Sequence, residues 1–524
     1  MDNLSELLTP HVDKQPERIA VATSDLRTVL SYRQLDILVK SAEAQLSSMG
    51  LSRGDTAAII SDNGIDFVVG FLAIVALGAR VAPLNPALTS SELNSRVSAL
   101  SAKAMLFPKH LAGQLENWKS AVGDAARWSM NIEGSGSDSA VSIANGDGRA
   151  LKPDTNAKKD LPIIHRDDVA VVMFTAGSTS APKAVPLTHG NLVESIRGIC
   201  SVYDLSPRDA TLIVMPLFHG HGLVAGLLST LASGGGAYLP STGVFSAHLF
   251  WPDMTRVGAT WYTAVPTMHR ILVNRAPHEY PSSSPVALRF IRSCSAPLDE
   301  SLAVAISTAF NTPVIAAYGM TETSHQTASN PLPDHGPNKT PSVGLPTGVE
   351  LRIVGDDGRD AATGTIGEIW VSGATVTAGY LDNANANSES FVDGWFRSGD
   401  LGSRDADNYL FVKGRLKDII NRGGEKISPN DIDAVLLSNP KVLEAASFGE
   451  PDSIYGENVH AAVVLRPGAQ VSEEELQEYC RSALSGFEVP ERIHIVTDLP
   501  RTAKGSIDRH ALAAQFSIHT AGSR

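Results

Sequence analysis

The sequence predicts an α/β protein with a large N-terminal domain of stacked α/β subdomains, an added β-rich subdomain and a small α+β C-terminal domain. Three observations predict it: the length, the alternation of apolar runs with helical patterns, and a change of texture after residue 350. The chain has 524 residues, enough for three to four domain-sized units. Hydrophobic residues make up 43% and charged residues 19%, as in a folded globular protein and unlike a disordered one.

Apolar runs rich in β-branched residues alternate with helical patterns through the first two thirds of the chain. Residues 56–61 (TAAIIS) predict a buried strand, 66–79 a helix, and 80–83 the start of the next strand. Further strand candidates are residues 169–174, 211–215, 260–265 and 313–317. Strands separated by helical stretches imply parallel sheets covered by helices.

Two segments differ from this alternation. Residues 133–159 are rich in Gly, Ser, Asp and Asn, which predicts an exposed loop. From residue 350 onward, short apolar runs are separated by turns such as GDDGRD and VDGWFRSGD, which predicts the β-rich subdomain. The segment after residue 414 predicts the compact α+β domain.

Charge and cysteine content exclude several classes of function. The 43 Lys and Arg against 56 Asp and Glu leave a net charge of −13, which argues against a nucleic-acid partner. The cysteines Cys200, Cys294 and Cys480 form no C-x-x-C pair, so zinc ribbons are excluded and a reducing compartment is favoured. The polar N-terminus is unlike a signal peptide, and the longest apolar stretch, 67–77, is about half of a membrane span. We therefore expect a cytoplasmic protein without stable membrane insertion.

A loop rich in hydroxyl groups follows the strand candidate 169–174. The segment FTAGSTSAPKAV, residues 174–185, holds one Gly, several Ser and Thr hydroxyls and Lys183. Small donors and one ammonium group can surround phosphate oxygens. The loop is not a Walker A motif, because no G-x-x-x-x-G-K-[ST] is present. By itself it is equally compatible with a polar surface loop.

Two further motifs carry groups suited to a nucleotide. In YGMTET, an aromatic ring at a strand end can stack on a base, Thr321 can bond a phosphate or carboxylate oxygen, and Glu322 can hold Mg²⁺. In GWFRSGD, Asp400 can accept hydroxyl protons of a ribose. The alternative for each motif taken alone is an ordinary turn.

Two basic segments lie in the last quarter of the chain. KGRLKDIINRGGEKISP, residues 413–429, surrounds a Gly pair with basic side chains, and LPRTAKGSIDR carries Lys504 in a Gly/Ser turn. Each alone fits a solvated surface loop. The five motifs in this order, however, resemble the adenylate-forming superfamily of acyl-CoA synthetases, adenylation domains and luciferases over essentially the whole chain.

The phosphate loop departs from the pattern T-S-G-T-T-G-x-P-K-G of that superfamily. Ala176, Ser178, Ser180 and Ala184 replace Ser, Thr, Gly and Gly. Ser178 and Thr179 keep hydroxyl groups, and Lys183 is retained. The resemblance therefore still implies ATP and Mg²⁺ as the groups bound by the large domain, with CoA as the acceptor of the acyl group.

The resemblance also implies roles for individual residues. Catalytic roles fall on Lys504, Thr321, Glu322 and Lys183. ATP or AMP would be contacted by Thr175, Ser178, Thr179, Ser295, Ala296, Pro297, Tyr318, Gly319, Met320, Asp400 and Arg415. Glu322 would support Mg²⁺, and CoA would pass Gly423 and Gly424. Lys417 matches the hinge about which the C-terminal domain rotates, so the resemblance implies domains at 1–413 and 418–524 with a hinge at 414–417.

The acid is the remaining unknown. Segments expected at the acid pocket are polar: Trp261-Tyr262-Thr263, Arg292-Ser293-Cys294-Ser295, and His325 after YGMTET. Bulky Trp261 would shorten the pocket, and hydroxyls with a His could hold a second carboxylate. The stretches FWPDMTRVGATWYTAVPTMHRIL, RFIRSCSAPL and TASNPLPDHGPNKTPSVG are most similar to the oxalate–CoA ligase branch. That similarity implies oxalate as substrate, with its distal carboxylate bound by Ser295, His325 and His219.

Four other functions remain open at this point. A medium- or long-chain fatty acyl-CoA ligase needs an apolar tunnel. A carrier-loading adenylation enzyme would transfer the acyl group to a phosphopantetheinyl protein. A luciferase-like oxidoreductase has the same scaffold and would need oxygen and a luciferin. A nucleotide-binding protein without activity fits the altered phosphate loop but not the retained Lys183, Glu322, Asp400 and Lys504.

Overall fold

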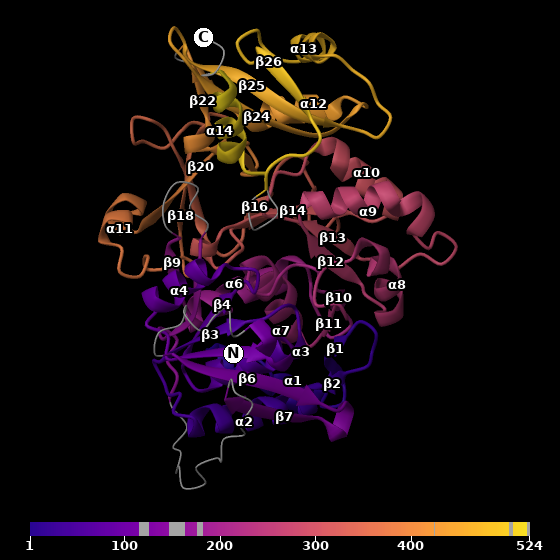
Figure 1. The fold of residues 1–524 in the computed structure, drawn as a ribbon, viewed down its shortest axis with the longest axis vertical. Coiled ribbons are helices and arrows are strands. Elements are labelled where there is room, and N and C mark those ends of the chain that lie inside the picture. Colours follow the sequence, from indigo (N-terminus) through magenta and orange to yellow (C-terminus); the bar gives the residue numbers. More distant parts are fainter. Residues whose placement is uncertain (115–124, 146–162, 176–181, 424, 502–506, 521–524) are drawn as a thin grey trace.

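The computed structural model describes residues 1–114, 125–145, 163–175, 182–423, 425–501 and 507–520. Ser178, Thr179, Gly424 and Lys504, named above as site residues, lie outside these ranges. Within them the chain forms two large mixed sheets and two smaller, mainly antiparallel ones. Figure 1 shows the C-terminal sheet at one end of the long axis and the N-terminal layers at the other.

The first large sheet has parallel strands in its centre and an antiparallel strand at each edge. Its strands, in spatial order, are β7 (Ala140–Asn145), β6 (Ala126–Glu133), β5 (Ala104–Pro108), β3 (Thr56–Ile60), β4 (Arg80–Leu84), β8 (Val169–Phe174) and β9 (Ala184–Thr188). The central strands β3, β4 and β5 are nearly or fully buried along their length, which explains why they are continuous apolar runs and not alternating patterns.

The second large sheet runs from β16 to β2 and has its parallel strands in the middle. In spatial order it contains β16 (Leu345–Pro346), β15 (Ala328–Ser329), β14 (Val314–Tyr318), β13 (Phe290–Ser293), β12 (Trp261–Ala264), β10 (Ala210–Leu212), β11 (Gly236–Leu239), β1 (Ile19–Thr23) and β2 (Val29–Ser31). Parallel strands β12, β13 and β14 end at the same edge, which is where ligands bind in open α/β sheets.

Helices fill the space between the two large sheets and cover their outer faces. The helices of residues 1–310 are α1 (Thr9–Lys14), α2 (Tyr32–Ser48), α3 (Ile65–Ala76), α4 (Ser90–Ala99), α6 (His189–Val202), α7 (Ser229–Ala232), α8 (Ala247–Val257), α9 (Pro266–Glu279) and α10 (Glu300–Phe310). Short 3₁₀ turns are η1 (Leu4–Glu6), η2 (Lys109–Gln114) and η3 (Gly136–Asp138), and η4 (His221–Leu228) is a π-helix.

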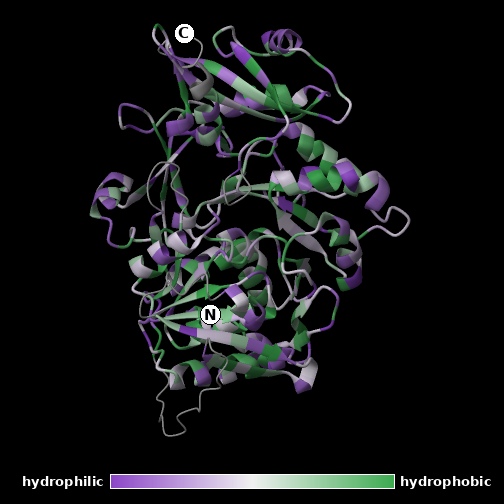
Figure 2. Cartoon of the chain, viewed as in Figure 1, coloured by the Kyte–Doolittle hydropathy of each residue, from purple (hydrophilic) through white to green (hydrophobic). Residues whose placement is uncertain are grey.

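The main core joins both large sheets. Its buried residues come from β1, β3, α2, α6 and above all α3, which is buried on all sides between the layers. A helix that is apolar all round needs such a position. Several helix starts are fixed by capping boxes, among them Ser31 with Gln34 at α2 and Thr188 with Asn191 at α6. Figure 2 shows hydrophilic colour on the peripheral helices α11 (Ala384–Ser390) and α13 (Glu473–Arg481).

The two smaller sheets follow in sequence. The β-rich subdomain contains β17 (Glu350–Val354), β18 (Gly367–Ser372), β19 (Phe391–Val392), β20 (Trp395–Arg404) and β21 (Leu410–Arg415). After the 3₁₀ turn η6 (Leu416–Asp418), the C-terminal sheet contains β22 (Ile420–Arg422), β23 (Glu425–Ile427), β24 (Val442–Asp452), β25 (Gly456–Leu465) and β26 (Arg492–Val496). Its helices are α12 (Pro429–Ser438), α13 and α14 (Arg509–Thr520).

The predicted mixed α/β class, with large N-terminal sheets and a smaller C-terminal domain, is confirmed. Strand β8 has the predicted bounds, whereas the helix predicted for 66–79 ends at Ala76 and the strand predicted for 211–215 spans Ala210–Leu212. The prediction of an exposed loop over 133–159 is wrong for Ala140–Asn145, which forms β7 against β6. Val141 and Ile143 alternate with polar residues there and are buried, a period of two that outweighs the turn-rich composition.

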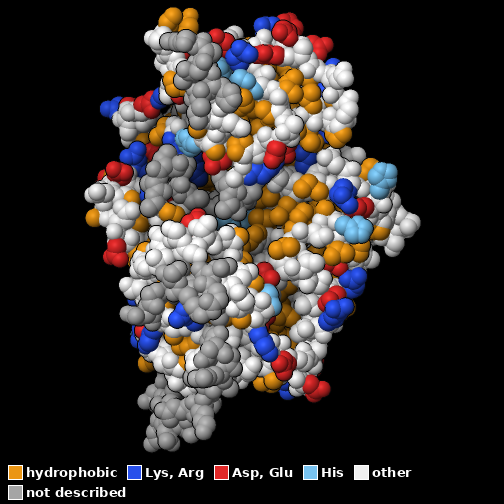
Figure 3. Space-filling view, viewed as in Figure 1, with side chains coloured by type: hydrophobic (Ala, Val, Ile, Leu, Met, Phe, Trp, Pro, Cys, Tyr) orange, Lys and Arg blue, Asp and Glu red, His pale blue; other side chains and the backbone are white. Residues whose placement is uncertain are grey.

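Among the helices in the described ranges, none combines the length and apolar character needed to cross a bilayer. Figure 3 shows basic and acidic side chains interspersed over the visible face, so the net charge of −13 is not gathered there into one patch.

A buried histidine in α6 makes the fold sensitive to acid. The ring of His189 is fully buried, and its Nδ1 accepts a hydrogen bond from the Leu4 backbone N–H at 3.2 Å. Burial lowers the pKa of His189 from 6.5 to about 4. The unfolded chain therefore takes up a proton near pH 6.5 that the folded chain does not bind until about pH 4, so this stability is complete above pH 6.5 and falls as the pH decreases toward 4.

Lowering the pH from 7.5 to 5.0 should therefore cost about 2 kcal/mol of the free energy of unfolding through His189 alone. Urea unfolding gives the free energy of unfolding at both pH values. The loss between pH 7.5 and 5.0 should be smaller by this amount in a His189→Gln variant than in the wild type. A His248→Gln variant is the control, because its side chain is 79% exposed. An unchanged pH difference in His189→Gln would contradict the prediction.

Candidate active site

The edge where β12, β13 and β14 end carries most of the candidate residues. Thr263 lies near the end of β12, Arg292 in β13 and Tyr318 at the end of β14. The chain then leaves the sheet through Ser295 after β13, and through η5 (Thr321–Thr323) and His325 after β14. Residues from separate parts of the sequence thus meet at one edge.

The residues predicted to contact the nucleoside gather around Asp400 in β20. Its Oδ2 accepts a hydrogen bond from the Tyr318 hydroxyl at 2.5 Å, and its Oδ1 lies 2.7 Å from Arg415 Nε. Register explains the second contact, since Asp400 faces Arg415 across the β20–β21 ladder. Burial raises the pKa of the Asp400 carboxyl, and Arg415 opposes that shift. The three predicted residues therefore form one polar group in which Tyr318 and Asp400 are buried and Arg415 is half-exposed.

Lys183 and Glu322, predicted to act at the phosphates, are joined by a residue that sequence reasoning missed, Tyr380. The Lys183 ammonium lies 4.5 Å from the centroid of the Tyr380 ring, a cation–π distance. The Tyr380 hydroxyl donates to Glu322 Oε1 at 2.9 Å. Tyr380 thus links the two charged residues. Its segment, TAGYLDN, shows no charge pattern or residue spacing that would mark Tyr380 as a site residue.

The phosphate loop itself lies largely outside the described residues, but its two ends are held together. The Thr175 backbone N–H donates to the Lys183 carbonyl at 3.0 Å, closing the β8–β9 connection. Thr321 opens η5 beside Glu322. These positions bring the ends of the loop and the YGMTET turn to the same side of the site, through the Lys183–Tyr380–Glu322 contacts.

The YGMTET turn folds back on itself, and Gly319 permits this. A Cβ atom at Gly319 would lie 1.4 Å from the carbonyl oxygen of His325, so no other residue fits. The His325 backbone N–H donates to the Met320 carbonyl at 3.0 Å. Ser324 and His325 have positive φ values of 54° and 88°. Such strained residues cluster at functional sites, and Ser295, with φ of 72°, is another at this edge.

Hydrogen-bonding groups gather where the sequence predicts the acid pocket. His221, the first residue of the π-helix η4, lies 3.0 Å through Nδ1 from Ser295 Oγ and 2.5 Å through Nε2 from Thr263 Oγ1. Its ring stacks on that of His325 with centroids 5.2 Å apart. Burial and Arg292 lower the pKa of both histidines well below 6.5, so both rings are neutral at neutral pH.

One expectation for the acid pocket is wrong, and one residue was absent from the predicted site. His221, two residues after the predicted His219, contacts Ser295, and the role predicted for His219 stays a prediction. His219 lies near the pair, since its charge contributes to the lowered pKa of His325. Trp261, expected to shorten the pocket, is fully buried in the main core and stacks on Phe290. The side chain of β12 that reaches this cluster is Thr263.

The remaining predicted residues lie around these clusters. Ala296 and Pro297 follow Ser295 at the strand end and are partly exposed and exposed. Lys417 lies in η6, where burial and Arg415 lower the pKa of its ammonium group and Lys183 adds to the effect. The predicted hinge is therefore close to Lys183. Gly423 has φ of 60° and donates its N–H to the Tyr455 carbonyl at 2.8 Å.

Known proteins settle the family. The model of the AMP-binding enzyme family matches residues 8–381, and that of the AMP-binding enzyme C-terminal domain matches residues 431–506. The chain belongs to the AMP-binding enzyme family. This AMP-binding enzyme thus has both parts that the sequence motifs indicated.

Relatives extend over nearly the whole AMP-binding enzyme. Oxalate–CoA ligase of Arabidopsis thaliana is 42% identical over 519 residues, covering 98% of this chain and 99% of the relative. Oxalate–CoA ligase of Saccharomyces cerevisiae is 36% identical over 524 residues, covering 96% and 95%. The structure of ATP-bound MatB from Rhodopseudomonas palustris has a TM-score of 0.86 at 27% identity, covering 98% of this chain and 99% of that one. The AMP-binding enzyme is therefore an AMP-forming acid–thiol ligase that acts on a small acid, ATP and CoA.

Proposed function

We propose that this AMP-forming ligase activates oxalate, forming oxalyl-AMP and pyrophosphate from ATP and then oxalyl-CoA and AMP from CoA. The observation that carries the proposal is the wall at the end of β12–β14. His221, His325 and Ser295 present hydrogen-bonding groups there, where a fatty acid would need apolar side chains. A second carboxylate buried without such partners would cost several kcal/mol. The two oxalate–CoA ligase relatives support the same substrate.

The first half-reaction requires a good leaving group, because a carboxylate does not exchange its oxygen with a thiol directly. The acid carboxylate attacks the α-phosphorus of ATP, and pyrophosphate leaves. The protein contributes positioning and charge stabilisation. We assign the phosphates to Ser178, Thr179, Lys183 and Thr321, the adenine and ribose to Tyr318, Asp400 and Arg415, and the neighbouring nucleoside contacts to Thr175, Ser295, Ala296, Pro297, Gly319 and Met320.

The donor chemistry of Glu322 fits a magnesium ion. Its Oε1 accepts one hydrogen bond from Tyr380, and a carboxylate oxygen is a ligand that Mg²⁺ prefers when nucleotide phosphates complete the coordination. Such an ion would neutralise charge on the phosphate oxygens. Glu322 would be the protein ligand of this ion, and Tyr380 would orient its carboxylate through the hydroxyl.

The small domain supplies the remaining groups. We propose domains at 1–413 and 418–524 with the hinge at 414–417, so that Lys504 reaches the carboxylate and α-phosphate in one orientation. In the other orientation Gly423 and Gly424 line the path of the CoA thiol. We also place the enzyme in the cytoplasm. This compartment keeps thiols reduced, which suits both the thiol of CoA and the three cysteines of the chain.

The proposal is tested by ATP–pyrophosphate exchange with a panel of acids. The expected order is oxalate above malonate, and both far above octanoate and benzoate. Thioester formation is then measured with free CoA and with a phosphopantetheinyl carrier protein, and free CoA should be the better acceptor. A preference for octanoate would reject oxalate and leave a fatty acyl-CoA ligase. A preference for the carrier protein would indicate a carrier-loading enzyme.

Removing the Tyr380 hydroxyl should weaken the use of magnesium. A Tyr380→Phe variant keeps the ring under Lys183 but loses the hydrogen bond to Glu322. We expect the Mg²⁺ concentration for half-maximal exchange to rise about fivefold, the effect of one hydrogen bond, while the KM for oxalate stays the same. A rise in the oxalate KM without a change in the Mg²⁺ dependence would contradict this role.

A further inference from the structure

Arg292 is a buried cation without a carboxylate partner. Its side chain is fully buried in β13, and within the described ranges no Asp or Glu forms an ion pair with it. Its side-chain hydrogen bonds within the described ranges go to neutral groups. They are Tyr203 Oη at 2.9 Å from Nε, Thr263 Oγ1 at 3.1 Å from Nη1, and His325 Nε2 and Gln326 Oε1, each at 3.1 Å from Nη2. Such a charge is costly to bury, so its position calls for a function.

A guanidinium group can only donate hydrogen bonds, so each atom that contacts it is an acceptor. Thr263 Oγ1 accepts from Arg292, and within the described ranges the only acceptor for the Thr263 hydroxyl proton is His221 Nε2, so a His221 that donated to Thr263 would leave this buried proton without a partner. His221 then carries its proton on Nδ1 and donates to Ser295 Oγ. Ser295 is exposed, and its own hydroxyl proton remains for a ligand.

Arg292 also contacts His325 directly, and the same rule fixes the direction of that hydrogen bond. His325 Nε2 faces Arg292 Nη2, so this nitrogen must be the acceptor. The neutral ring therefore carries its proton on Nδ1. Both stacked imidazoles thus carry their proton on Nδ1. Ser295 and His325, which end the two series of hydrogen bonds from Arg292, can therefore each donate a hydrogen bond to an anion.

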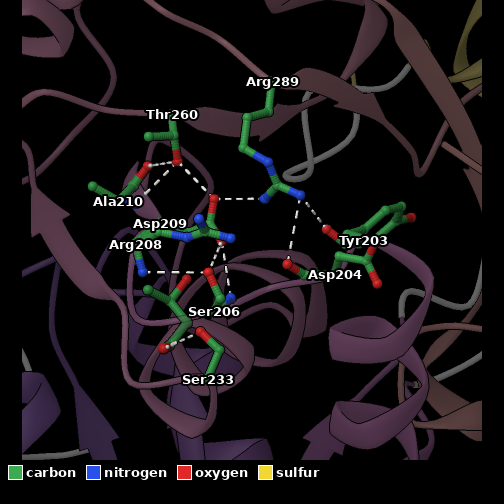
Figure 4. A network of polar contacts seen from close by, with 10 residues as sticks. Tyr203, Asp204, Ser206, Arg208, Asp209, Ala210, Ser233, Thr260 and Arg289 are labelled. Atoms are coloured by element: carbon green, nitrogen blue, oxygen red, sulfur yellow. Dashed lines mark hydrogen bonds and ion pairs between the residues drawn. The ribbon is translucent and has the colours of Figure 1, made fainter. Parts of the chain in front are cut away.

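A polar network holds the base of this arrangement in place. Figure 4 shows Arg289 joining Asp209 to the backbone carbonyls of Tyr203 and Asp204. The Tyr203 hydroxyl in turn accepts from Arg292 Nε. The segment after α6 therefore fixes the plane of the Arg292 guanidinium before any acid binds.

We propose that Arg292 is a positioning residue that sets the tautomers of His221 and His325, and so makes Ser295 and His325 obligate hydrogen-bond donors for the distal anionic group of the acid. This inference rests on the proposed function for the identity of the acid, but the tautomers are a property of the acid-free enzyme. We name the five residues Arg292, Thr263, His221, Ser295 and His325 the Arg292 relay.

Nitrogen-15 NMR of the histidine rings in the full-length enzyme tests the tautomers directly. Two-bond and three-bond couplings, assigned with His221→Gln and His325→Gln variants, distinguish Nδ1–H from Nε2–H and from imidazolium. We expect Nδ1–H at neutral pH for both rings, although free imidazole side chains favour Nε2–H. An Nε2–H ring or an imidazolium at either position would overturn the proposal.

A Thr263→Val variant removes the hydroxyl group between Arg292 and His221 and keeps the shape of the side chain. His221 should then lose its fixed tautomer while His325 keeps it, and the KM for oxalate should rise about tenfold. The kcat and the KM for ATP should change little, and Thr263→Ser should restore the wild-type values. Thr211→Val is the matched control, because Thr211 is equally buried in the neighbouring strand β10 and its hydroxyl has no partner.

The outcomes separate the two proposals. An unchanged oxalate KM and tautomer in Thr263→Val, or the same change in Thr211→Val, would overturn the Arg292 relay while leaving oxalate as substrate. If the wild type prefers another acid, oxalate is rejected, and the NMR result still decides whether the relay exists.

Discussion

Replacing Lys504 by alanine is expected to reduce ATP–pyrophosphate exchange with the preferred acid by ~10²–10³, the effect of losing one preorganised donor to transition-state charge. Negative charge develops between the attacking carboxylate and the α-phosphate, and we assign its neutralisation to this ammonium group. The residues flanking the Lys504 turn are anchored. Arg501 pairs with Ile507 in an antiparallel bridge, and its guanidinium lies 2.7 Å from both carboxylate oxygens of Glu444. The substitution should therefore remove a charge without disturbing the anchored residues Arg501 and Ile507.

The second half-reaction provides the control within the same variant. Thioester formation from chemically prepared acyl-AMP and CoA should remain close to wild type, because the ammonium group is not needed once AMP is the leaving group. Lys441→Ala is a matched variant, since Lys441 is also on the C-terminal domain and is half exposed beside Glu475. Equal losses in both half-reactions would rule out a C-terminal domain that supplies Lys504 to only one of them.

A His325→Ala variant should raise the KM for oxalate by about 10–100-fold, corresponding to the ~1.5–3 kcal/mol of a hydrogen bond to a charged group. The ring is held on one side by Arg292 and stacked on His221, so its other nitrogen is the preorganised donor. The backbone at His325 accepts a strained conformation, which alanine can share without filling the ring's place. Initial-rate measurements with varied oxalate give the result.

Two comparisons sharpen that measurement. The KM for ATP should change by less than a factor of about two, because the nucleoside group around Asp400 is separate. A His335→Ala variant, whose half-exposed ring pairs with Asp204 at 2.9 Å, should leave both constants unchanged. An unaltered oxalate KM in His325→Ala would refute the assignment of the distal carboxylate to this residue.

The sequence predicted the elements best where a single pattern dominates. The continuous apolar runs of β3 and β8 predicted buried strands, and the order of motifs predicted the family. The prediction failed at β7, where a turn-rich composition indicated a loop. The neighbouring strand β6 pairs with this segment and buries Val141 and Ile143.

Long-range partners were the other limit. Asp400 and Arg415 were both expected near the ribose, but only the β20–β21 register shows that they face each other. Arg292 was noted as part of a polar segment, and nothing local indicates that its acceptors come from the segment after α6, β12 and the turn after β14. Tyr380 was missed entirely, because its role follows from an approach to Glu322 across 58 positions of the chain.

The pairing of Asp400 with Arg415 has a mechanical consequence. Arg415 is the last residue of β21, and Lys417 lies two positions further along the chain in η6. A rotation about the proposed hinge at 414–417 would therefore also move the end of β21, which carries Arg415, the partner of Asp400. With the proposed ribose site and hinge, a bound ribose that tightens the Asp400–Arg415 pair would also restrict the backbone at the hinge. Nucleotide binding and the orientation of the small domain would then be coupled directly through residues 415–417.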